Sequence, residues 1–308
     1  MRNAFAHEIT QLAQQDERIV LLSGDIGNRL FDEFKEKCPG RFHNCGVAEA
    51  NMIGVAAGLA LSGLRPVCYT IAPFITYRCM EQIRVDACYH NVPVTIVGTG
   101  AGLAYASLGA THHSCEDIGM LRLLPGLVVM APADAHEVRG CLRAVMQQQK
   151  PAYLRIGKKG ESLVHSTTPT VVIGKALVLT PPGKVTLIST GNMLPAAQAT
   201  ATLLGNHGMS CGVVSFHTVK PLDAALLKQA FATSQVVATI EEHSVLGGLG
   251  GSVAEWLSEQ SAPGARLIRL GTADEFYHET GEQEHAHEHF DLVPERMAAR
   301  LLAALKQP

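Results

Sequence analysis

Several features that would mark a secreted, membrane or nucleic-acid-binding protein are missing from this sequence. Its eight cysteines are scattered without a Cys-x-x-Cys pair, which argues against a zinc site or a disulfide framework and predicts reduced thiols. The formal net charge is -3, and no basic run occurs, which argues against a nucleic-acid or membrane-surface role. No apolar segment reaches membrane length, and residues 1–8 lack the apolar core of a signal peptide. We therefore expect a cytoplasmic protein.

The chain is rich in small and apolar residues. Hydrophobic residues make up 47% of its 308 residues and 29 residues are glycine, which is enough for a large core divided between two domains. Apolar runs alternate with helical patterns, which predicts an α/β fold with parallel strands. We expect a first domain over 1–160, a linker rich in Ser, Thr, Pro and Lys over 161–183, and a smaller α/β domain over 184–308.

The segment 46–60 places a carboxylate at the start of an apolar helix. Met52, Val55 and Ala56 recur at helical spacing, which predicts a buried helix, and the small residues between them permit close packing against a second backbone. Glu49 falls in the first turn, where free N–H groups and the helix dipole favour an acid. From the residues alone, a capping glutamate is the preferred interpretation of Glu49.

The same segment, Gly-Val-Ala-Glu-Ala-Asn-Met, resembles the pyrimidine-domain motif of transketolase and 1-deoxyxylulose-5-phosphate synthase. Gly-Ala-Thr-His at 109–112 resembles the Gly-Pro-Thr-His loop of that family, and the match continues in order along nearly the whole chain. The resemblance implies a thiamine-diphosphate-enzyme pyrimidine-binding domain followed by a transketolase C-terminal domain. In that family the motif glutamate, here Glu49, hydrogen-bonds N1′ of the aminopyrimidine and so activates the cofactor.

The resemblance also implies further residues of the cofactor pocket. A helix is predicted over 72–86, with Phe74 and Tyr77 on one face, where the family's aromatic residues pack against the pyrimidine ring. The third aromatic position of the family is Met80 in this chain. Asp25, which follows a predicted strand, resembles an aspartate near the cofactor, although an aspartate that closes a turn fits equally well.

On the substrate side, His112 matches a histidine that faces the substrate and moves protons on ketose hydroxyls. Arg155 matches the arginine that binds the substrate phosphate, although a strand-end arginine at the surface is an equal alternative. Leu108 stands in place of a substrate-reading aspartate and Gly100 in place of a phosphate-facing histidine. Both changes remove polar contacts to a sugar phosphate, so we expect the usual pentose phosphates to be disfavoured.

Four histidines near the end of the chain are interleaved with glutamates; they are His278, His285, His287 and His289. Their spacing could hold a metal, but a solvated loop or helix surface is the preferred interpretation.

The chain has no room for the diphosphate-binding domain with which complete transketolases begin. The resemblance therefore implies the small subunit of a split enzyme, which assembles as an α2β2 complex with a separate diphosphate-binding chain that holds most of the Mg²⁺ ligands. The expected reaction transfers a two-carbon ketol unit from a ketose donor, a sugar or sugar phosphate, to an aldehyde. The alternatives are a 1-deoxyxylulose-5-phosphate synthase-like or 2-oxoacid dehydrogenase beta-type subunit that uses pyruvate or another 2-oxoacid, and a non-catalytic assembly or regulatory subunit.

Overall fold

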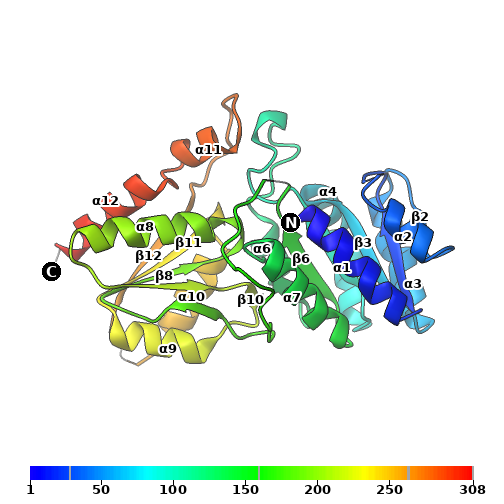
Figure 1. Ribbon diagram of the computed structural model, residues 1–308, viewed down its shortest axis with the longest axis horizontal. Helices are drawn as coiled ribbons and strands as arrows, with labels where there is room; N and C mark the ends of the chain where they lie inside the picture. The colour runs from blue at the N-terminus through cyan, green and yellow to red at the C-terminus, as the bar shows by residue number, and fades with distance from the viewer. Residues whose placement is uncertain (28, 159, 262–263, 307–308) are drawn as a thin grey trace.

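A computed structural model describes residues 1–27, 29–158, 160–261 and 264–306, which form two α/β domains lying side by side (Figure 1). The first domain is built on a seven-stranded sheet in the order β10-β5-β6-β4-β3-β1-β2. Its strand pairs are parallel except that β10 runs antiparallel to β5. The strands are β1 (Ile19–Ser23), β2 (Phe42–Asn44), β3 (Arg65–Ile71), β4 (Thr95–Thr99), β5 (Val128–Met130), β6 (Ala152–Ile156) and β10 (Thr218–Lys220).

Helices cover both faces of this sheet, because successive side chains of a buried strand point to opposite sides. Leu21 packs in one core with Phe5, whereas Leu22 packs in the other with Met52. The first core is covered by α1 (Arg2–Gln15) and α7 (Ala135–Gln147), and the second by α3 (Glu49–Leu61). Shorter helices of this domain are α2 (Asp32–Lys37) and α6 (Asp117–Leu121).

The helix predicted over 72–86 is present but irregular. It begins as α4 (Ala72–Thr76), tightens into a 3₁₀ turn, η1 (Tyr77–Cys79), continues as α5 (Met80–Gln82) and widens into a π-helix, η2 (Ile83–Tyr89). The Thr76 hydroxyl donates to the Ala72 carbonyl at 2.7 Å, a back-bond that bends helices. Because each change of helix type rotates the following side chains, spacing alone could not predict how this segment presents its aromatic residues.

The second domain has a five-stranded sheet in the order β12-β11-β8-β9-β7, parallel except for β7 against β9. Helices α8 and α12 pack on one face, and α9 and α10 on the other (Figure 1). The strands are β7 (Leu177–Thr180), β8 (Val185–Ser189), β9 (Cys211–Ser215), β11 (Val236–Ser244) and β12 (Arg266–Thr272). The helices are α8 (Leu194–Asn206), α9 (Ala224–Thr233), α10 (Leu249–Ser258), α11 (Gln283–His289) and α12 (Pro294–Leu305), with 3₁₀ turns η3 (Ala106–Leu108) and η4 (Gly191–Met193) elsewhere.

The two domains share structural elements. Strand β10 follows β9 in the chain but completes the sheet of the first domain by pairing with β5. One apolar core runs from the α3 face of the first domain to the α9 and α10 face of the second. The segment 161–183, predicted as a linker, contains β7, an edge strand of the second sheet. No helix in the described part of the chain is long and apolar enough to cross a membrane.

Candidate active site

Glu49 is the first residue of α3, and it is only 3% exposed although it carries a carboxyl group. Strand β2 ends at Asn44, so the short loop 45–48 delivers the helix start to the carboxyl edge of the first sheet. Gly24, which follows β1, lies so close that a Cβ added there would be 3.5 Å from Glu49 Cγ. That Cβ would be in ordinary contact with Glu49, and it would collide with the Thr70 hydroxyl, 2.9 Å away.

The predicted buried face of α3 is correct at Met52 and Ala56, which are both buried. The prediction for Val55 was wrong, because this side chain is 42% exposed. Val47, just before the helix, and Leu61, at its end, are also exposed, by 73% and 62%. We call Val47, Val55 and Leu61 the α3 surface. Helical spacing identifies an apolar helix but not which of its apolar side chains stay exposed on the chain.

Arg78 connects Glu49 to the aromatic residue Phe74. Its Nη1 lies 3.2 Å from Glu49 Oε2, and its guanidinium carbon lies 4.1 Å from the centre of the Phe74 ring. A cation over an aromatic face is attracted by the ring quadrupole, so Arg78 is held against Phe74 while it pairs with Glu49. Sequence analysis did not single out Arg78, although it follows Phe74 by four residues, a spacing that places side chains on one helix face.

His112 continues this line of side chains. Its ring centre lies 5.1 Å from that of Phe74 in an edge-on arrangement, and its Nδ1 is 3.0 Å from the Thr111 hydroxyl. Partial burial, followed by the neighbouring His113 and Arg78, lowers the pKa of His112 below its usual value. A neutral imidazole at pH 7 can accept a proton, which is the property a general base needs.

Tyr105 and Lys158 form the far end of the line, and sequence analysis did not single out either residue. The Tyr105 ring lies 5.9 Å from His112, and the Lys158 ammonium group lies 4.6 Å from the centre of the Tyr105 ring. Tyr105 fills the space beside Gly100, where an added Cβ would be 1.9 Å from Tyr105 Cε2. Gly100 also has φ +70°, which favours glycine, so a histidine at this position is excluded by both geometry and space.

Tyr77 and Met80 are less closely tied to this line than the spacing suggested. The Tyr77 hydroxyl donates to Glu116 at 2.5 Å. Burial, with the Asp117 and Glu116 carboxylates, raises the pKa of Tyr77 above its usual value. Tyr77 begins the 3₁₀ turn, so it does not keep the regular helical relation to Phe74. Met80 is half-buried and packs against the core beneath α3.

Asp25 lies on the neighbouring loop and is exposed. It adopts φ +58°, and its carboxylate accepts a hydrogen bond from Asn44 Nδ2 at 2.8 Å. The side-chain oxygen of Asn44, Oδ1, in turn accepts from the backbone N–H of Gly46 at 2.9 Å. Asp25 therefore braces the loop that leads into Glu49, which is the turn-forming alternative considered for this residue.

Arg155 lies inside the molecule, so the surface alternative considered for this residue is wrong. It is 3% exposed, and its Nε lies 2.9 Å from Asp117 Oδ2. Its Nη2 donates to the carbonyl groups of Ser114 and Glu242, at 2.9 Å each. Because these donors are already engaged with the protein, the geometry gives no support to the predicted contact with a substrate phosphate. Arg155 instead joins the first domain to β11 of the second.

The junction around Arg155 is rich in buried titratable groups. His243 Nε2 accepts the backbone N–H of Gly119 at 3.1 Å, and burial lowers the pKa of His243 to about 4. Glu241 accepts the N–H groups of Leu249 and Gly250 at 2.7 Å each, at the start of α10. Burial raises the pKa of Glu241 to about 7. These contacts hold the two domains in a fixed relation behind the candidate site.

Two of the four histidines near the end of the chain, His287 and His289, contact carboxylates. His287 Nε2 lies 2.6 Å from the buried Glu242, and His289 lies 3.0 Å from Glu279 and 3.1 Å from Glu275. The interpretation as solvated surface was wrong for His287, whose side chain is only 19% exposed. Among the described residues, no group of three or more His, Cys, Asp or Glu side chains is arranged to hold a metal ion.

Comparison with known proteins identifies the family of this chain. Residues 1–160 match the family model of the transketolase pyrimidine-binding domain, and residues 174–297 match that of the transketolase C-terminal domain. The chain belongs to the transketolase family. A putative transketolase C-terminal section from Methanocaldococcus jannaschii is 33% identical, with 100% of this chain and 96% of that protein covered.

Two further transketolase proteins carry the word subunit or split in their names. The 6-deoxy-6-sulfo-D-fructose transketolase subunit SqwH of Clostridium sp. is 35% identical, with 95% of this chain and 90% of that protein covered. A solved structure described as a split gene transketolase, inactive beta4 tetramer, superposes with a TM-score of 0.89 at 33% identity, covering 99% of this chain and 97% of that one. The fold and the domain order are therefore those of the family.

The residues at the sheet edge fit the aminopyrimidine of thiamine diphosphate, the cofactor of the transketolase family. Glu49 supplies a buried carboxylate, and Phe74 supplies an aromatic surface that is only partly covered. The Thr70 hydroxyl beside Gly24 is buried and has no hydrogen-bond partner among the described residues. A polar atom in this condition is costly unless a further group satisfies it.

Proposed function

We propose that this chain is the small subunit of a split transketolase-type transferase and is active only with a separate diphosphate-binding chain. The carrying observation is the continuous line of side chains Glu49, Arg78, Phe74, His112 and Tyr105 along the carboxyl edge of the first sheet. In parallel α/β sheets this edge is where ligands bind. Membership of the transketolase family indicates the type of reaction that residues at this edge would carry out.

The α3 surface supports a partner subunit. Val47, Val55 and Leu61 expose apolar side chains along α3, the helix that begins at Glu49, and apolar side chains gathered on an exposed face mark an interaction site. The relatives named as a C-terminal section, a subunit and a split gene product have this same pair of domains. We propose an α2β2 assembly in which the α3 surface meets the diphosphate-binding chain, and in which that chain holds most of the Mg²⁺ ligands.

Each residue of the site has a proposed role. When bound, thiamine diphosphate supplies the carbon nucleophile for cleavage and formation of the bond next to a ketose carbonyl. Glu49 binds the pyrimidine ring at N1′ and shares a proton with it. Phe74 orients that ring by stacking on it, and Tyr77 and Met80 support Phe74 from the same helical segment. For the ring to stack there, Arg78 must leave the face of Phe74 that it now covers. Asp25 holds the loop that positions Glu49.

His112 is the proposed proton carrier on the substrate, because its pKa is lowered and its ring adjoins Phe74. We propose Lys158 rather than Arg155 as the cation that holds an anionic substrate tail, since Lys158 lies beside Tyr105 and Arg155 is engaged by Asp117. Leu108, which is 52% exposed, adds an apolar wall. These features fit a specialised ketose, sugar or sugar phosphate, better than an ordinary pentose phosphate.

The test is donor consumption by this chain alone and mixed with a diphosphate-binding chain of a split transketolase from the same source. Thiamine diphosphate and Mg²⁺ are supplied, and the donors are ketose phosphates, unphosphorylated ketoses, a sulfonated ketose and pyruvate. We expect turnover only in the mixture and only with a ketose. Turnover with pyruvate would instead identify a synthase-like or dehydrogenase-type enzyme. A complex that binds the cofactor but consumes no donor would contradict the transferase proposal and favour an assembly role.

A further inference from the structure

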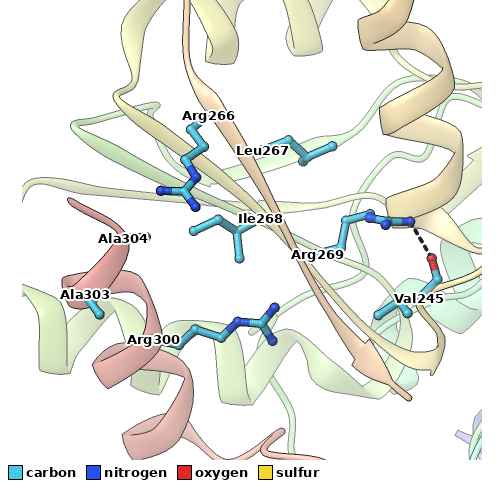
Figure 2. Close-up of a pocket in the computed structure, with 8 residues that line it drawn as sticks. All are labelled: Val245, Arg266, Leu267, Ile268, Arg269, Arg300, Ala303 and Ala304. Carbon is cyan, nitrogen blue, oxygen red and sulfur yellow. Dashed lines mark hydrogen bonds between the residues drawn. The ribbon is translucent and has the colours of Figure 1, made fainter. Parts of the chain in front are cut away.

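The outer edge of the second domain holds a cavity of about 470 Å³ that has no place in the function proposed above. It lies along β12, the outermost strand of the five-stranded sheet, and against the last turns of α12 (Figure 2). Its volume is within the range of small-molecule sites and is several times that of a single inorganic anion.

Positive charge dominates the lining of this cavity. Arg266 and Arg269 come from β12 and Arg300 from α12, and among the residues that the structure describes no aspartate or glutamate lines the cavity. Figure 2 shows the guanidinium groups of Arg266 and Arg300 directed into the space over Ile268, one from the strand and one from the helix. Arg269 extends toward Val245, to whose carbonyl group its Nη1 donates at 2.8 Å.

Arg300 differs from its neighbour on the same helix. Arg296, one turn earlier, pairs with the Asp291 carboxylate at 2.5 Å. Arg300 forms no ion pair within the described ranges of the chain, and neither does Arg269. The electrostatic cost of bringing guanidinium groups together is therefore not offset by a protein carboxylate at Arg300, and an anionic ligand would offset it.

The rest of the cavity is apolar. Ile268 forms its floor, and Ala303 and Ala304 form the side that belongs to α12. Small side chains on the helix leave room for a carbon skeleton, whereas the guanidinium groups match the geometry of phosphate oxygens. The combination is typical of a site for a small organic molecule that carries a phosphate group.

We propose that this cavity, lined by Arg266, Arg269, Arg300, Ile268, Ala303 and Ala304, is a binding site for a small organic phosphate. The site lies in the second domain, and the residues of the candidate active site all belong to the first.

The experiment is isothermal titration calorimetry of the full chain with ADP, ribose 5-phosphate and inorganic phosphate. We expect one saturable site that binds at least one of the two esters more tightly than inorganic phosphate. Arg300→Gln should weaken ester binding about tenfold, the scale of a lost charge-assisted hydrogen bond. Arg296→Gln is the matched control on the same helix and should leave the affinity unchanged. Lys158→Met should also leave it unchanged, which separates this site from the active site.

Three results would overturn the proposal. The first is the absence of saturable binding of either ester to the unmodified chain. The second is an equal loss of affinity in Arg296→Gln and Arg300→Gln, which would indicate diffuse surface charge. The third is unchanged binding in Arg300→Gln when its thermal unfolding matches that of the unmodified chain.

Discussion

The guanidinium group of Arg155 meets the carboxylate of Asp117 at 2.9 Å, in a place where the two side chains are 3% and 0% exposed. Tyr153 donates a further hydrogen bond to Asp117 at 2.6 Å. Arg155 also reaches the carbonyl group of Glu242 on β11, so this pair links strand β6, helix α6 and the second domain. A buried ion pair with such complete bonding fixes geometry, and removing one member leaves a buried charge without compensation.

We expect Arg155→Met to lower the free energy of unfolding by about 3 kcal/mol or more, because Asp117 would lose its cation in a buried place. Arg296→Met is the matched control, since Arg296 pairs with Asp291 at 2.5 Å but the two side chains are 55% and 63% exposed. The control should cost less than about 1 kcal/mol, as half-exposed pairs do. Urea unfolding followed by circular dichroism measures both, and equal losses would contradict a structural role for Arg155.

Glu49→Gln should reduce turnover by the assembled enzyme about 100-fold or more, since glutamine keeps the volume but cannot share a proton as the carboxylate does. Glu8→Gln serves as a control at another buried carboxylate, far from the candidate site along the chain. The measurement is kcat under saturating donor and cofactor, with thermal unfolding to verify folding. Normal turnover by the Glu49 variant would exclude the proposed role.

Lys158→Met should raise KM for an anionic ketose about tenfold and leave KM for an uncharged ketose nearly unchanged, because only the anion loses a charged partner. Lys150→Met, at a surface turn after α7, is the control. Steady-state kinetics of the assembled enzyme with both donors makes the comparison. A similar rise in KM for both donors would show that Lys158 acts on the shape of the site rather than on substrate charge.

Gly100→Ala should cost more stability than Gly109→Ala. Both glycines have positive φ, +70° and +78°, so each substitution carries a backbone cost of about 1–2 kcal/mol. Only the Cβ at position 100 would collide with another side chain, Tyr105, whereas nothing lies within 4 Å of the position at 109. The excess should disappear in a Tyr105→Ala background. If Gly100→Ala still costs more stability than Gly109→Ala in the Tyr105→Ala background, the difference arises from the backbone and not from the collision with Tyr105.

His243 should make stability depend on pH below neutrality. Burial lowers its folded pKa to about 4, so between pH 6.5 and pH 4 the unfolded chain binds a proton that the folded chain does not. The free energy of unfolding therefore falls as the pH falls, and the gap from 6.5 to about 4 corresponds to roughly 3 kcal/mol. Glu241 contributes with the opposite sign, because its raised pKa destabilises the fold as the pH rises toward 7.

We expect His243→Gln to flatten the acid side of the stability profile relative to the unmodified chain, as measured by urea unfolding at a series of pH values. Glu241→Gln should steepen it, because the opposing contribution is removed. Parallel profiles for all three proteins would show that neither group changes its protonation on unfolding.

The elements of the first domain that frame the site could be predicted from sequence because their signals are local. Apolar runs mark the strands, and the helical spacing after Glu49 marks α3. Val55 could not be placed, because exposed and buried apolar side chains of one helix share the same apolar character. The π-helix at Ile83–Tyr89 could not be predicted, because its residues show no spacing that distinguishes it from an α-helix.

The polar contacts of the site were harder to predict, because they join segments that only the topology brings together. Arg155 and Asp117 are 38 residues apart in the chain, and Arg155 and Glu242 are 87 apart. Family resemblance identified position 155 but not the buried carboxylate that engages it. Tyr105 and Lys158 meet for the same reason, since one follows β4 and the other follows β6, two neighbouring strands.

Strand β10 limits how this protein can be recombined with its relatives. The two family models meet between residues 160 and 174, which suggests a natural point for exchanging domains. A hybrid joined there would pair β5 with a foreign β10, because residues 218–220 of the second domain complete the sheet of the first. A fragment ending there would leave β5 as an open edge, inviting other chains to pair with it. The sheet of the first domain is therefore complete only when the second domain supplies β10.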